Sequence, residues 1–216
     1  MFSFLTDIIG QILGFFARLT GSLGLGVILL TVVIRLALHP LTLSQSKSLA
    51  AMRELQPKLD ELRKKYKDKP EQYQQKLVEL YQEHKINPMG GCLPMLIQLP
   101  ILYALFFVLR DLTGLFPDMD PRFLLWDLTQ ANHAETWYLL PILSGVTTYG
   151  QMRLAAPSDP SQRALMIIMP LFFVYISAQF AAGLVLYWVV ANLLSMGQQY
   201  LINRQLAAAQ KGEKAR

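Results

Sequence analysis

The sequence predicts an all-α polytopic membrane protein with five transmembrane helices, a cytoplasmic helical hairpin and an N-terminal interfacial amphipathic helix. Hydrophobic residues make up 53% of the chain and charged residues only 16%, whereas soluble domains carry about a quarter charged residues. Apolar runs close to the roughly 20 residues that cross a bilayer recur along the chain. The Lys and Arg residues gather between alternate runs, as expected for cytoplasmic segments.

Residues 1–22 predict an amphipathic helix that lies on the membrane surface. One face of this helix is polar and the other is apolar. The polar face carries Asp7, Gln11, Gly14 and Arg18, and the apolar face carries Phe4, Ile8, Ile12, Phe15 and Leu19. The segment has no basic leading region, which argues against a signal peptide. An additional, weakly polar span is the alternative interpretation.

Five spans are predicted at approximately residues 24–43, 93–112, 136–155, 164–180 and 183–202. With the hairpin they form a core of residues 23–204, followed by a short basic tail at 205–216. Half of the 20 Lys and Arg residues fall between the first two spans, and further basic residues follow the third span and the fifth. Because cytoplasmic segments are rich in Lys and Arg, this pattern predicts an external N-terminus and a cytoplasmic C-terminus.

Residues 48–86, between the first two spans, predict a charged helical hairpin. Pro57 predicts a bend or a new helix start, and Pro70 suits the first turn of a helix. A simple connection between two spans needs far fewer residues, so the hairpin is a candidate docking surface for another protein, with a solvated connection as the alternative. The candidate contacts are Arg63, Lys64, Lys65 and Lys67. The loop at 114–135 is expected to be irregular.

Arg35 is the most informative residue, because it lies inside the first predicted span. At 1.5 Å per residue it is roughly 12 Å from the inner end of that span, close to the middle of the bilayer. An arginine there costs at least ~2.5 kcal/mol and cannot become neutral. The only carboxylate within the predicted spans is Asp111, near the outer end of the second span. We therefore favour a water-filled cavity around Arg35 over a buried salt bridge.

Other polar side chains within the spans are candidates to line the same cavity. They are Gln98, Gln151, Trp188 and Asn192. Polar side chains also join helices in membranes, and the two roles remain open for Gln98, Gln151 and Asn192. For Thr31, Ser144 and Ser195 we favour the role of joining helices.

The sequence predicts no metal site, no cofactor and no enzyme activity. His39, His84 and Cys92 have no second ligand at a spacing typical of metal sites. Neither a phosphate-binding glycine loop nor a nucleophile with its base is evident. The net charge of +5 is spread over several segments, so no specific binding of nucleic acid is expected.

The sequence resembles the YidC family of membrane protein insertases. The motifs that carry the resemblance are Asn87-Pro88, Gly91-Cys92-Leu93-Pro94 and Ile97-Gln98-Leu99-Pro100, together with "IRLALHPLTLSQSKS", "LPILSGVTTYGQM" and "GLVLYWVVANLLSMGQQ". The resemblance implies a five-span core with a groove open to the cytoplasm and to lipid. It assigns the groove arginine to Arg35, a third-span glutamine to Gln151 and a fifth-span aromatic residue to Trp188.

The resemblance implies a membrane protein insertase and folding chaperone in the bacterial inner membrane. The implied partners are nascent membrane proteins, membrane lipid, and the Sec translocon, the ribosome or the targeting machinery. Two features of many relatives are not seen, namely a large external domain and an N-terminal lipoprotein cysteine. The short tail argues against ribosome binding through a long basic tail. A small anion transporter or channel is the main alternative, although no inverted repeat is evident.

Overall fold

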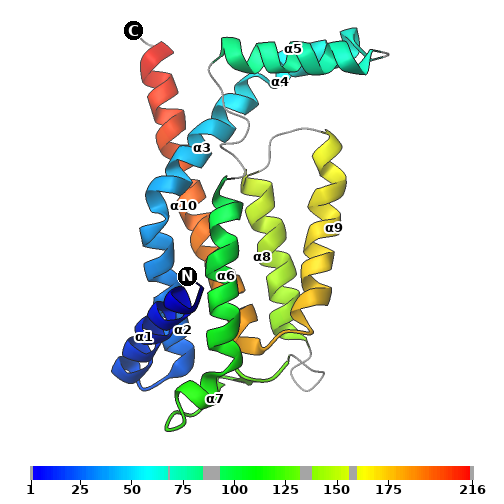
Figure 1. The fold of residues 1–216 in the computed structure, drawn as a ribbon. Coiled ribbons are helices and arrows are strands. Elements are labelled where there is room, and N and C mark those ends of the chain that lie inside the picture. Colours follow the sequence, from blue (N-terminus) through cyan, green and yellow to red (C-terminus); the bar gives the residue numbers. More distant parts are fainter. Residues whose placement is uncertain (1, 68, 85–92, 132–137, 156–159, 215–216) are drawn as a thin grey trace.

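The computed structural model describes residues 2–67, 69–84, 93–131, 138–155 and 160–214 (Figure 1). Most of these residues are helical. The helices are α1 (Phe2–Thr20), α2 (Leu23–Ala37), α3 (His39–Glu54), α4 (Gln56–Lys65), α5 (Pro70–Glu83), α6 (Leu93–Arg110), α7 (Leu112–Leu115), α8 (Leu139–Ala155), α9 (Pro160–Ser177) and α10 (Ala182–Lys214). The two strands are β1 (Arg122–Phe123) and β2 (Trp126–Asp127).

The first predicted span is not one straight helix. It divides at Leu38 into α2 and α3, which are bent by 59°. Pro40 lies in the first turn of α3, where its missing N–H and fixed φ are tolerated. In the described part of the chain, no single helix is long and apolar enough to cross a membrane alone, whereas α2 and α3 together meet that criterion.

Helix α1 packs against α2 and α6. The contact uses a stripe of buried residues, Ile9, Leu13 and Ala17, which lies between the two predicted faces. Gly26 allows α2 to approach closely, since a Cβ there would lie 3.0 Å from the Ala17 backbone nitrogen. The predicted division of α1 into two faces was therefore incomplete, because a third stripe fixes the helix to the bundle. Phe15 remains 63% exposed.

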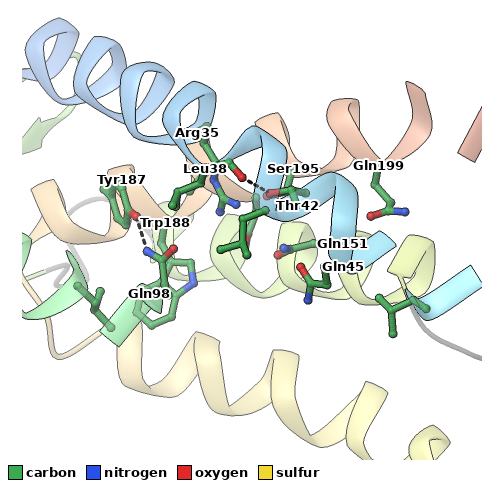
Figure 2. A pocket seen from close by; sticks show the side chains of 15 residues that line it. Arg35, Leu38, Thr42, Gln45, Gln98, Gln151, Tyr187, Trp188, Ser195 and Gln199 are labelled. Atoms are coloured by element: carbon green, nitrogen blue, oxygen red, sulfur yellow. Dashed lines mark hydrogen bonds between the residues drawn. The ribbon is translucent and has the colours of Figure 1, made fainter. Parts of the chain in front are cut away.

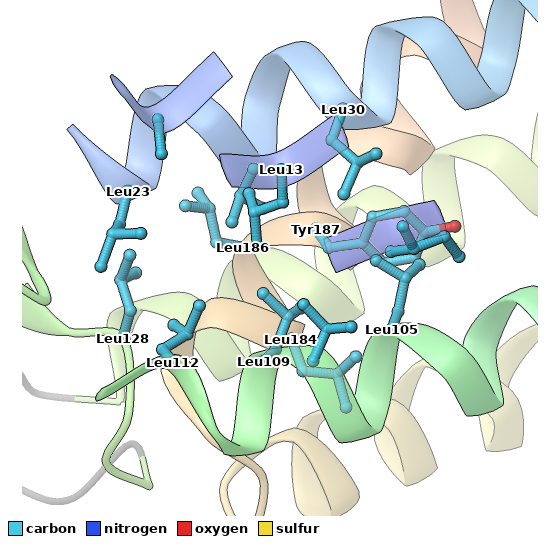
Figure 3. Close-up of a cluster of buried hydrophobic side chains, with 14 of the residues drawn as sticks. Leu13, Leu23, Leu30, Leu105, Leu109, Leu112, Leu128, Leu184, Leu186 and Tyr187 are labelled. Atoms are coloured by element: carbon cyan, nitrogen blue, oxygen red, sulfur yellow. The ribbon is translucent and has the colours of Figure 1, made fainter. Parts of the chain in front are cut away.

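The main core lies between α1, α2, α6 and α10 (Figure 3). Its fully buried side chains include Leu13, Leu23, Leu30, Leu105, Leu109 and Leu112. Helix α8 packs against both α9 and α10. Ser144 of α8 shares a 2.8 Å hydrogen bond with Ser177 of α9, which confirms its predicted role in joining helices.

The segment after α6 is more regular than expected. Strands β1 and β2 pair antiparallel, with Phe123 opposite Trp126. The backbone N–H of Gly183 donates to the carbonyl of Leu128 over 2.9 Å, which ties this segment to the start of α10. The sequence did not predict β1 and β2, because a strand of two residues is too short to carry a recognisable pattern.

Helices α4 and α5 form an antiparallel hairpin at the opposite end of the bundle from α7 (Figure 1). Pro57 lies in the first turn of α4, and Pro70 begins α5. Neither helix contains a buried residue. At the same end, α10 continues to Lys214, so most of the predicted basic tail is helical.

Candidate functional site

A polar cavity of ≈ 300 Å³ lies between α2, α3, α6, α8 and α10 (Figure 2). All five residues predicted for the groove line it, although the predicted spans that carry them are far apart in sequence. They are Arg35, Gln98, Gln151, Trp188 and Asn192. The structure thus brings together the residues that the sequence nominated.

Helical periodicity explains why several side chains of one helix face the cavity together. Thr42, Gln45 and Leu49 follow one another at spacings of three and four on α3, so they share one face. Trp188 and Asn192 do the same on α10. The bend at Leu38 keeps Arg35 of α2 and these residues of α3 beside one cavity.

Arg35 is partly buried at the side of the cavity. Within the part of the chain that the structure describes, no carboxylate lines this cavity, and none lies within salt-bridge distance of Arg35. The volume has room for roughly ten water molecules at liquid density. Because a guanidinium cannot give up its proton, water and side-chain dipoles are the available means of solvating it. The salt-bridge alternative therefore finds no support among the described residues.

Gln98 and Asn192 both line the cavity and join helices, the two roles that the sequence left open. The amide of Gln98 donates to the Tyr187 hydroxyl oxygen over 2.7 Å. The amide of Asn192 donates to Thr147 and Thr148 of α8 over 3.2 and 3.0 Å. Each residue joins two helices and also lines the cavity. Gln151 lines the cavity without a hydrogen-bond partner among the described residues.

Two of the polar residues expected to join helices behave differently. The Oγ of Ser195 is buried, lines the cavity and has no hydrogen-bond partner within the described part of the chain. The Thr31 hydroxyl donates to the carbonyl of Val27 in its own helix over 2.6 Å. The role predicted for these two residues was wrong, because helical spacing does not show whether a hydroxyl bonds its own backbone or a neighbour.

Two hydrogen bonds connect α10 to α3 and to the end of α2 beside the cavity. The Ser46 hydroxyl donates to the side-chain oxygen of Gln199 over 3.0 Å. The neighbouring Gln198 donates to the backbone carbonyl of Arg35 over 3.4 Å. Sequence reasoning missed these contacts, although the motif "GQQ" was part of the family resemblance.

An apolar cavity of ≈ 640 Å³ adjoins the polar one. Leu102 and Trp188 line both cavities. The rest of its wall is apolar or aromatic and consists of Leu99, Pro100, Tyr103, Phe106, Phe107, Phe180 and Leu184. Trp188 also packs edge-on against Phe173 at 4.3 Å between ring centroids. Sequence reasoning did not find this cavity, because its wall combines residues from separate segments of the chain.

The basic residues of the hairpin gather at its tip. Arg63, Lys64 and Lys65 form the last turn of α4, Lys67 follows it, and all four side chains are exposed. The Nζ of Lys65 lies 5.6 Å from the ring centroid of Tyr66. Within the described residues, no group of three His, Cys, Asp or Glu side chains is arranged to hold a metal ion.

A family model described as "60Kd inner membrane protein" matches residues 15–210. The chain belongs to the 60Kd inner membrane protein family. Among its relatives, the membrane protein insertase YidC of Geobacter sulfurreducens is 41% identical over 199 residues, covering 92% of this chain and 37% of that protein. YidC of Francisella tularensis subsp. novicida is 39% identical over 212 residues, covering 98% and 38%. The resemblance to YidC is therefore confirmed.

The fold of this chain is similar to that of a solved relative. An active YidC insertase crystal structure with the first transmembrane domain resolved has a TM-score of 0.74 and 34% identity, and the match covers 90% of this chain and 46% of that one. The chain spans less than two fifths of the length of the two relatives above. Family membership assigns it to the bacterial inner membrane.

Proposed function

We propose that this protein is a membrane protein insertase and folding chaperone that works without a nucleotide or other cofactor. The observation that carries the proposal is Arg35 beside a polar cavity that no described carboxylate neutralises, next to an apolar cavity that shares Trp188. A polar segment and an apolar span of one client would thus have adjacent sites. The names of the relatives support the same activity.

The polar cavity receives the segment of the client that must cross the membrane. Arg35 attracts an acidic side chain in this segment, and a charge pair at 4 Å is worth about 4 kcal/mol at an effective dielectric constant of 20. Gln151 offers further hydrogen bonds to a passing backbone, because its side chain has no described partner. The segment thereby crosses part of the bilayer without contact with hydrocarbon.

The apolar cavity receives the client's hydrophobic span. Leu99, Tyr103 and Phe107 of α6 are exposed along it, so the span exchanges one apolar surface for another as it moves into lipid. Each Leu or Ile of the span contributes about 0.5 kcal/mol to the whole transfer from water into lipid. This gain provides the driving force, and the apolar cavity favours an insertase over a small anion transporter.

We infer an external N-terminus and a cytoplasmic C-terminus, with the bent pair α2–α3, α6, α8, α9 and α10 as the five spans. The hairpin then lies in the cytoplasm, where its exposed cations Arg63, Lys64, Lys65 and Lys67 can contact acidic surfaces of the ribosome or the targeting machinery. The Sec translocon is a further proposed partner. On the outer side, α1 exposes Phe15 and Leu19 towards lipid.

Reconstituted proteoliposomes test the proposal. Two client proteins that differ only in an acidic or a neutral translocated tail are offered to the wild type and to Arg35→Ala. We expect Arg35→Ala to slow the acidic client most, and Arg35→Lys to retain much of the activity. Arg153→Ala is the matched control, since Arg153 is exposed and lies outside the cavity lining. Normal insertion of the acidic client by Arg35→Ala would refute the role of Arg35.

A further inference from the structure

Three cavities follow one another along α6 and α10. The polar cavity shares Leu102 and Trp188 with the apolar cavity. The apolar cavity in turn shares Phe106, Phe180 and Leu184 with a third cavity of ≈ 320 Å³. A client whose hydrophobic span occupied the apolar cavity would therefore have the polar cavity at one end of that span and the third cavity at the other.

A positively charged side chain lines the third cavity. Arg110, the last residue of α6, lines it together with Gln179. Gln98 and Arg110 lie twelve residues apart on α6, which corresponds to roughly 18 Å along the helix axis. The distance is more than half of a hydrocarbon core of about 30 Å. Arg35 and Arg110 thus mark the two ends of the row of cavities.

Two acidic residues of the described chain, Asp111 and Asp127, have their carboxylates directed to other partners. Asp111 turns towards α7, since a side chain added at Gly114 would overlap its carboxylate. Asp127 accepts hydrogen bonds from the backbone and hydroxyl of Thr129 and from Gln130. Among the residues that the structure describes, no carboxylate lines the third cavity, and none lies within salt-bridge distance of Arg110.

We propose that Arg110 and Gln179 form an exit site for the acidic translocated segment of a client. The inference rests on the proposed function and extends it to the outer end of the path. A lone cation at Arg35 would hold an acidic segment in the membrane. A second guanidinium at the far end offsets the loss of that first attraction, because its fork of N–H donors pairs well with carboxylates. The Gln179 amide supplies a further donor.

The test compares arginine variants in proteoliposomes with the acidic-tail and neutral-tail clients. We expect Arg110→Ala to insert the acidic client roughly two- to five-fold more slowly, the range for one exposed ion pair, and to insert the neutral client at the normal rate. Arg110→Glu should be slower still, and Arg110→Lys should restore most of the rate. Arg122→Ala is the matched control, because Arg122 is an exposed cation on β1 that lies outside the three cavities.

The outcomes separate this inference from the function on which it rests. If Arg35→Ala slows the acidic client but Arg110→Ala and Arg122→Ala behave alike, the exit site is wrong and the insertase proposal stands. If both Arg110→Ala and Arg35→Ala insert the acidic client at the normal rate, the proposed function itself fails. Impairment of both clients by Arg110→Ala would indicate a structural role and overturn the exit site.

Photocrosslinking provides a second measurement that does not depend on rate. A photoreactive amino acid replaces Gln151 in one preparation and Gln179 in another. We expect the acidic tail to crosslink first from position 151 and later from position 179, and the later crosslink to decrease in Arg110→Glu. A tail that crosslinks from 151 and reaches the vesicle lumen without ever crosslinking from 179 would overturn the proposal.

Discussion

The side-chain amide of Gln98 on α6 donates a 2.7 Å hydrogen bond to the hydroxyl oxygen of Tyr187 on α10. Both residues line the cavity that contains Arg35, and Tyr187 is only 3% exposed. The bond therefore connects two helices of the proposed insertion path at a buried position. Its loss leaves a buried hydroxyl unpaired.

Gln98→Leu is expected to lower the free energy of unfolding by about 1–3 kcal/mol, because a buried polar group loses its partner. Tyr187→Phe should have a similar effect. The double variant should be less destabilised than the sum of the two, with a coupling of about 1 kcal/mol. Thermal unfolding in detergent measures all three, with Tyr175→Phe at an exposed site as the control. Strict additivity would contradict a direct bond.

Two glycines give a matched pair for helix packing. A Cβ at Gly26 would meet the Ala17 backbone at 3.0 Å, whereas a Cβ at Gly197 of α10 would meet nothing within 4 Å. Gly26→Ala should therefore destabilise the protein by about 1–3 kcal/mol through overpacking. Gly197→Ala should stabilise it by up to about 1 kcal/mol through helix propensity. Thermal midpoints that move in the same direction for both variants would contradict this account.

Asp127 predicts a pH dependence of stability. Burial alone would raise the pKa of this carboxyl, but the hydrogen bonds from Thr129 and Gln130 and the charge of Arg122 outweigh it, and its pKa lies below the ordinary value. The stabilisation is therefore complete above the unfolded pKa of about 3.9 and is lost as the pH falls through the lower folded pKa.

Asp127→Asn should remove this part of the pH dependence. The difference in thermal midpoint between wild type and variant should be largest near neutral pH and should shrink below about pH 4. Asp118→Asn, at an exposed position, is the control. If the difference in thermal midpoint grew as the pH fell, the proposed direction of the Asp127 pKa shift would be wrong.

The exposed cations of α4 predict a defect that depends on how the client is delivered. The combined change Lys64→Ala, Lys65→Ala and Lys67→Ala should weaken binding to the ribosome or targeting machinery, with the largest effect at low salt. Insertion of a purified client should remain normal. Cosedimentation with ribosomes and insertion during translation measure the defect, with Lys76→Ala of α5 as the control. Equal insertion by both routes would refute docking at this site.

The sequence was most informative where a residue was chemically out of place. Arg35 in an apolar segment without a nearby carboxylate was enough to predict a cavity, and the structure gives it one. Gln151 and Trp188 were nominated from the residues as candidates to line it, and the family resemblance then assigned them to the groove, because helical spacing alone cannot pair one span with another. Gln98 and Asn192 proved to join helices and line the cavity at once, whereas Gln151 lines the cavity without a described partner.

The features that were missed depend on contacts between distant segments. The 59° bend at Leu38 is consistent with Pro40, but a proline near a helix start does not reveal an angle. The apolar cavity is formed by residues of α6 and α10 together, and either helix alone reads as an ordinary apolar segment. Ser195 was misassigned because a hydroxyl looks the same in sequence whether it faces a helix or a cavity.

The position of Trp188 between two unlike cavities has a practical consequence. Its indole borders a polar volume on one side and an aromatic, apolar one on the other. The emission colour of an indole responds to the polarity around it, so this side chain is a built-in fluorescent reporter of what occupies either volume. With Trp126 and Trp137 replaced by Phe, passage of a single client would be visible in real time without any attached dye.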